Sequence, residues 1–201
     1  MRPANSMIWT WDQILGATKI VGKKRLYSDQ DFAKCAKEIN FRILPPSYCE
    51  YMKKLGCGEW SAELYIGVPW HEMETATLRY KVNAWKDAIE IVKRRDYSFI
   101  LDPIRREEEE RKPLDQLEKR FAKLIQFGGF GNGYCIYWDT NRILKGGDMK
   151  ICIANARDRE LYDFDGSLLE FIGEAFVSKR FNEICPLTGS RWNCKPVFKC
   201  M

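Results

Sequence analysis

The sequence contains a single histidine, His71, and this count limits the chemistry that the chain can perform. Sites with two or three histidine ligands are excluded, and any triad that needs an imidazole base must use His71. The pair His71-Glu72 matches the first half of a zinc-protease helix motif, but no second histidine follows. Glu72 therefore has no metal-bound water to activate. We expect no metal or cofactor, and an enzyme with an unrecognised site near His71 is the least favoured alternative.

Four glycines fall between residues 128 and 133, a density that phosphate-binding loops also show. A phosphate cradle needs such glycines between a strand and the N-terminus of a helix, where free N–H groups face the anion. Here an aromatic and β-branched stretch, residues 134–138, follows the glycines. Asn132-Gly133 is typical of a hairpin turn, because both positions tolerate positive φ. The sequence predicts a structural turn rather than a nucleotide site.

The eight cysteines and the paired carboxylates give no further catalytic arrangement. The cysteines are scattered and never spaced as C-x-x-C, so we expect free, mostly buried thiols rather than disulfides or metal ligands. Pairs such as Asp163 and Asp165 have the spacing of a carboxylate dyad, but their flanking residues are those of turns. The sequence therefore predicts a protein that is not an enzyme.

The charge balance is mildly basic, with 33 Lys and Arg against 28 Asp and Glu, a net charge of +5 and a pI of about 8.7. The basic clusters at 23–25 and 93–95 are short, so nucleic acid is not an expected partner. The N-terminus lacks the features of a signal peptide, and no apolar run reaches the roughly 18 residues of a membrane span. We expect a cytoplasmic protein that does not contact membranes.

Helix signals are the clearest elements. Capping boxes predict helix starts at three positions, Thr10, Ser28 and Ser167. Pro46 suits the first turn of another helix, and Gly56 is placed to end it. A long amphipathic helix is expected from residue 78, within a charged insertion near 75–112.

Strand signals follow these first helices. Apolar and polar residues alternate over 59–68, which predicts one strand with one solvated face. Shorter strands are expected at 124–127, 134–139 and 149–153, with a turn at Lys145-Gly146-Gly147. Helices first, then strands, then a closing helix predict an α+β fold.

The order of these motifs resembles the SUKH superfamily, the Smi/Knr-like family of immunity-protein type. The residues that stand at its signature positions are Glu38, Leu44, Pro45, Tyr48, Tyr51, Gly56, Gly58, Leu64, Ile66 and Pro69. Residues 127–134 with Trp138-Asp139 resemble its later strand pair, and residues 167–172 its C-terminal helix. The chain departs from the pattern at Tyr134, where an acidic residue is usual, and in the insertion near 75–112.

The resemblance implies a twisted, mainly antiparallel sheet packed against several helices, in a SUKH-like domain over residues 1–177. Residues 178–201 follow as a basic, cysteine-containing C-terminal extension, with five basic residues against one acidic residue. This segment either wraps back onto the core through Phe181, Trp192 and Phe198 or forms a separate contact arm.

The resemblance also implies a function that needs no catalysis. We expect a protein-binding module, an immunity protein that neutralises a cognate toxin of nuclease type; a Smi/Knr-like regulatory scaffold is the alternative. The expected partner-binding residues are Glu59, Glu63, Tyr65, Trp138 and Asp139. Acidic residues at such a surface would complement a basic nuclease.

Overall fold

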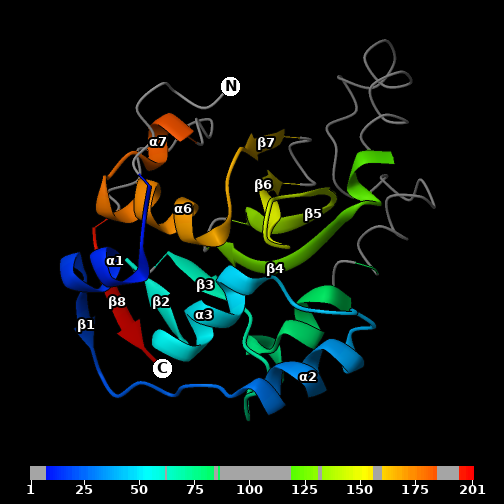
Figure 1. Cartoon of the computed structure of the whole chain (residues 1–201), viewed down its shortest axis with the longest axis horizontal. Coiled ribbons are helices and arrows are strands. Elements are labelled where there is room, and N and C mark those ends of the chain that lie inside the picture. The colour runs from blue at the N-terminus through cyan, green and yellow to red at the C-terminus, as the bar shows by residue number, and fades with distance from the viewer. Residues whose placement is uncertain are drawn as a thin grey trace, which may run out of the picture.

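The computed structural model describes residues 8–61, 63–83, 86, 119–130, 133–155, 160–184 and 195–201. Within these residues the chain has the predicted α+β class, with helices and an open, mostly antiparallel sheet of eight strands. The strands lie in the order β1-β8-β2-β3-β4-β5-β6-β7 (Figure 1). Their bounds are β1 Lys19–Val21, β2 Gly58–Trp60, β3 Leu64–Ile66, β4 Leu124–Phe130, β5 Cys135–Ile143, β6 Met149–Asn155, β7 Glu160–Phe164 and β8 Val197–Cys200.

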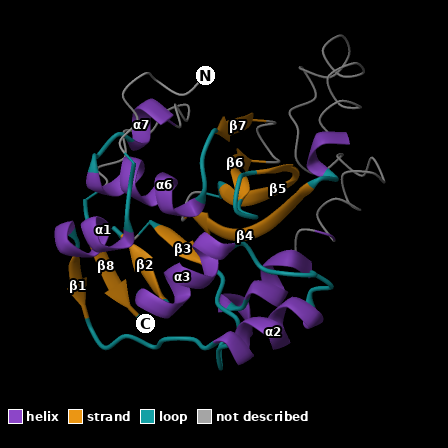
Figure 2. Ribbon diagram, in the orientation of Figure 1, coloured by secondary structure: helices purple, strands orange, loops and turns teal. Residues whose placement is uncertain are grey.

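Four helices begin where the sequence signals predict, whereas the short helix Phe181–Ile184 was not predicted. Their bounds are α1 Trp11–Ala17, α2 Asp29–Glu38, α3 Pro46–Lys54, α6 Leu168–Ile172 and α7 Phe181–Ile184, with a short 3-10 helix at Glu74–Ala76 and a π-helical turn at Gly173–Val177. All three predicted capping boxes are formed, at Thr10, Ser28 and Ser167. Helices α1, α3 and α6 bury their apolar residues in one cluster with one face of the sheet, and Figure 2 shows them grouped around β2 and β3.

The prediction of a single strand over 59–68 is wrong. Ser61 has a φ of 52°, which reverses the chain and divides the segment into β2 and β3. The two strands pair antiparallel, with Glu59 opposite Tyr65 and Trp60 opposite Leu64. Because the turn keeps the alternation in register, Trp60 and Leu64 still share the buried face.

The glycine-rich segment joins two antiparallel strands, as predicted, but the first strand continues past its predicted end at 127 to Phe130. Asn132 of the predicted turn lies outside the described residues. Gly128 and Gly129 lie inside β4, and Gly133 has a φ of 90° where the chain turns into β5. The turn at 145–147 joins β5 to β6, again as predicted, with positive φ at Gly146 and Gly147. Strands β1, β7 and β8 are additions that the sequence reading missed.

The C-terminal segment packs back onto the core, the first of the two arrangements considered for it. Strand β8 lies between β1 and β2, parallel to β1 and antiparallel to β2. Phe181 and Phe198 are fully buried, and the Phe198 ring lies 5.5 Å from that of Trp60 between centroids. Trp192 lies outside the described residues, as does most of the 75–112 insertion, of which 75–83 and 86 are described.

Candidate functional site

Trp138 belongs to the core and not to a binding surface, which corrects the sequence-based expectation. Its side chain is fully buried, stacked on Phe127 at 4.4 Å between ring centroids and edge-on to Tyr48 at 5.2 Å. In β5 it points to the helix-covered face, whereas its neighbours Tyr137 and Asp139 point to the other face of the sheet. A partner could reach this indole only if the core opened.

Asp139 is also enclosed, with 1% of its surface exposed. The expectation that it contacts a partner is therefore wrong as well. Its Oδ2 lies 2.9 Å from the guanidinium of Arg120 and 3.9 Å from that of Arg142. Its Oδ1 accepts the backbone N–H of Asn141 at 3.1 Å. A buried carboxylate needs such partners, because an unpaired charge in the interior costs several kcal/mol. Asp139 therefore has a structural role.

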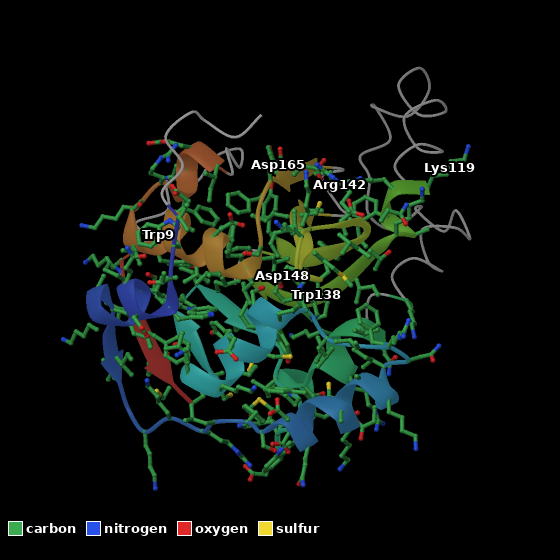
Figure 3. All side chains as sticks on the ribbon, viewed as in Figure 1. Trp9, Lys119, Trp138, Arg142, Asp148 and Asp165 are labelled. Carbon is green, nitrogen blue, oxygen red and sulfur yellow. The ribbon has the colours of Figure 1, made fainter. Side chains whose placement is uncertain are left out.

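The ion pairs of Asp139 extend along the β5–β7 end of the sheet. Arg142 contacts Asp163 at 2.6 Å and Asp165 at 3.1 Å, and Asp165 also pairs with Lys150. Arg142 and Asp165 are seen together above β5 in Figure 3. The Lys150 ammonium is the main reason why the pKa of Asp165 lies below its ordinary value. Positive and negative groups alternate in this network, so it joins neighbouring strands by ion pairs and does not form an acidic surface.

The remaining expected residues, Glu59, Glu63 and Tyr65, lie on the β2–β3 hairpin. Glu59 and Tyr65 are cross-strand neighbours on the sheet face opposite to Trp138. Glu59 lies 3.9 Å from the ammonium of Lys199, which offsets its charge, and Glu63 is exposed in the turn. The structure thus brings together two of the five expected residues and leaves no concentrated acidic patch among them.

A different group of residues presents an exposed aromatic side chain in a fixed orientation. We call it the Trp70 cluster, and its members are Arg25, Tyr27, Asp31, Trp70 and Glu72. Trp70 is 45% exposed, yet its indole Nε1–H donates to Asp31 at 3.0 Å and its ring lies 4.1 Å below the guanidinium carbon of Arg25. The Tyr27 hydroxyl donates to the Trp70 carbonyl at 3.0 Å, and the two rings meet edge-on.

The electrostatics of the Trp70 cluster hold these partners in place. The N–H and hydroxyl of Ser28 are the main reason why the pKa of Asp31 is lowered, and the indole N–H of Trp70 lowers it further. Arg25 forms a two-point contact with Glu72, at 3.2 and 3.4 Å, which lowers the pKa of that carboxyl. Asp31, which accepts from the indole N–H, and Arg25, which lies over the indole face, are therefore both charged at neutral pH.

Sequence reasoning missed the Trp70 cluster. Its members come from the loop before α2, from the first turn of α2 and from the loop after β3, and no local spacing relates Arg25 to Trp70. The one available signal was the position of Trp70, which follows Pro69 and belongs to none of the periodic apolar patterns that predict helices and strands. The exposed side chains of Leu26 and Met73 follow members of the cluster in sequence.

The structure gives His71 a local role. Its Nδ1 accepts the backbone N–H of Met73 at 3.0 Å in the loop beside the Trp70 cluster. In the described part of the chain, no three histidine, cysteine or carboxylate side chains come close enough to hold a metal ion. The six described cysteines are free thiols. No helix among the described residues combines the length and apolar character that a membrane crossing needs.

No protein-family model matches the sequence, and neither a curated protein nor a solved structure matches it. The likeness to the SUKH superfamily thus remains a prediction from the motifs quoted above.

Proposed function

We propose that this chain is a non-catalytic, cytoplasmic protein-binding module, and that it acts as an immunity protein that neutralises a cognate toxin. The observation that carries the proposal is the orientation of Trp70, an exposed indole held by Asp31, Arg25 and Tyr27. The SUKH resemblance supplies the class of partner. A Smi/Knr-like regulatory scaffold, the second candidate, would use the same surface.

A fixed tryptophan is a suitable anchor for a protein interface. Trp, Tyr and Arg are enriched among the residues that dominate binding energy, and they act best when their conformation is set before binding. In the Trp70 cluster, Asp31 and Arg25 favour one orientation of the indole, so a partner would gain apolar contact with less further ordering. These properties favour binding of a protein over binding of a small ligand.

The nuclease type of the toxin rests on the family resemblance alone. The acidic surface expected to attract a basic nuclease is not formed by the five residues that suggested it, because Asp139 is enclosed and Glu59 faces Lys199. The Trp70 cluster has a mixed charge, with Arg25 paired to Glu72. We therefore assign the affinity for the partner to the apolar contact of Trp70. The charged residues contribute only to the rate at which the partner approaches.

The test is co-expression with the toxin domain encoded beside this gene. The unchanged protein is expected to restore growth and to co-purify with the toxin. Trp70→Ala should raise the Kd at least tenfold and weaken protection, whereas Ile143→Ala, which removes an apolar side chain that is 64% exposed, should leave both unchanged. Absence of protection and of co-purification by the unchanged protein would refute the immunity role. Equal binding by Trp70→Ala would refute the assignment of the surface.

A further inference from the structure

Lys81 is a nearly enclosed cation on the sheet face opposite to the core helices. Only 9% of the residue is exposed, and its ammonium lies 4.4 Å from the ring centroid of Tyr65 and 5.8 Å from that of Tyr80. The face of an aromatic ring attracts a cation, but it compensates less of the lost hydration than a carboxylate does. Burial accordingly lowers the pKa of Lys81.

Among the described residues, no carboxylate pairs with the Lys81 ammonium. On the same face of the sheet, the carboxylates of Asp139, Asp163 and Asp165 are paired with Arg120, Arg142 and Lys150. Enclosed lysines rarely lack a carboxylate partner, since an unpaired charge is costly in the interior. An anion that comes from outside the chain would complete the arrangement.

A second polar group without a hydrogen-bond partner in the described structure lies beside this ammonium, namely the hydroxyl of Tyr65. The Lys81 ammonium lies over the ring that carries this hydroxyl, which places both donors on one side of the sheet. Together they offer an ammonium and a phenol to the same oxygen-bearing ligand.

Among the described residues, the backbone of β4 and uncharged side chains lie beside the Tyr65 hydroxyl. Opposite Tyr65 stands Gly129, where a Cβ would lie 3.1 Å from the Tyr65 hydroxyl. The Gln126 amide donates to Cys135 Sγ at 3.2 Å and to the Gly128 carbonyl at 3.3 Å. Burial raises the pKa of the Cys135 thiol, so this sulfur is uncharged. One positive charge and one phenol match a monoanion better than a phosphate, which usually needs several donors.

We infer that Lys81 and Tyr65 form a binding site for a carboxylate group, with the ammonium as ion-pair partner and the phenol as hydrogen-bond donor. The site is separate from the Trp70 cluster, and the inference does not depend on the proposed function. The carboxylate belongs either to a small free acid or to a side chain that a partner inserts. Both sources present the same chemistry to Lys81.

The test is a titration of the ¹⁵N-labelled protein with sodium acetate, followed by NMR and compared with sodium chloride at equal ionic strength. Saturable shifts of the Lys81, Tyr65 and Gly129 amides are expected with acetate and not with chloride. Lys81→Met should abolish them, Tyr65→Phe should weaken binding about tenfold, and Lys86→Met, which alters a neighbouring exposed lysine, should change nothing. Equal shifts with both salts, or saturable shifts that persist in Lys81→Met, would overturn the inference.

A second arm separates the two sources of the carboxylate. The acetylated and amidated peptide Gly-Glu-Gly carries one side-chain carboxylate on a short chain. A site for free acids should bind acetate at least as tightly as this peptide, and a site for a partner's side chain should bind the peptide more tightly. If Lys81→Met does not fold, the comparison of Tyr65→Phe with the unaltered protein still decides whether the carboxylate site exists. The expected tenfold loss in Tyr65→Phe requires only that the ring remain in place.

Discussion

The carboxylate of Asp148 accepts two hydrogen bonds from Ser47, at 2.9 Å from the backbone N–H and 2.7 Å from the hydroxyl. Ser47 lies in the first turn of α3, and the N-cap residue of that helix, Pro45, offers no side-chain acceptor. The β5–β6 turn therefore caps a helix that is 101 residues distant in sequence. This contact ties the helical first part of the chain to the β5–β6 hairpin. Figure 3 shows the position of Asp148.

Asp148→Ala should lower the free energy of unfolding by about 1 kcal/mol, because two donors at the start of α3 lose their acceptor. Asp148→Asn keeps an oxygen in the same position and should lose less than half as much. Urea denaturation of the three proteins measures the difference. An equal loss in both variants would mean that the charge of Asp148, and not its capping geometry, stabilises α3.

Gly56 and Gly146 form a matched pair for a second prediction. Both have positive φ, 74° and 93°, but an added Cβ would lie 1.8 Å from the Arg25 carbonyl oxygen at Gly56 and would meet nothing within 4 Å at Gly146. Gly146→Ala should therefore cost about 1 kcal/mol of stability through backbone strain alone. Gly56→Ala should cost about 3 kcal/mol or more and disturb the loop that carries Arg25. Similar urea midpoints for the two variants would contradict this expectation.

The stability of a Trp138 variant distinguishes a core role from a binding role for this residue. Trp138→Ala should lower the free energy of unfolding by about 3–5 kcal/mol, because it removes the ring that stacks on Phe127 and leaves a cavity. Ile143→Ala, at an exposed position of the same strand, should stay within about 0.5 kcal/mol. Thermal or urea unfolding measures both. A small loss in Trp138→Ala would return this residue to the list of candidate contact residues.

The parts of the fold that the sequence predicts are those coded by neighbouring residues. The capping boxes at Thr10, Ser28 and Ser167 are complete within four residues each, and glycines mark the turns at 133 and 146–147. The β2–β3 turn was missed because Ser61 adopts a positive φ that a serine rarely takes. Strands β1 and β8 were missed because their pairing joins residues that are far apart in sequence.

The site was harder to predict for the same reason. Trp138 and Asp139 were expected on one binding surface, although adjacent residues of a strand point to opposite faces of the sheet. The sequence also did not say which face of β5 the helices cover, and so Trp138 was taken for an exposed residue. The Trp70 cluster depends on Arg25 and Asp31, whose approach to Trp70 is set by the path of the loop before α2. Lys81 reads in sequence as one more basic residue of a charged insertion. Its burial follows from packing against β3.

The lowered pKa of Asp31 predicts a pH dependence of stability that can be assigned to one residue. The N–H and hydroxyl of Ser28, followed by Trp70 Nε1, favour the charged carboxylate in the folded state. A carboxyl whose pKa is lower in the folded than in the unfolded state stabilises the fold above the unfolded value, about 3.9, and loses this effect as the pH falls through the folded value. Asp31→Asn should therefore be less stable than the unchanged protein at pH 6, and the gap should narrow by pH 2.5.

Urea midpoints at the two pH values measure this gap. The comparison variant Glu63→Gln removes an exposed carboxylate outside the capping box and corrects for the general effect of one charge fewer. The narrowing follows because Asp31 becomes neutral in acid and then differs little from asparagine as an acceptor. A gap of the same size at pH 6 and pH 2.5 would show that the shape of the Asp31 side chain, rather than its charge, holds the start of α2 and the indole of Trp70.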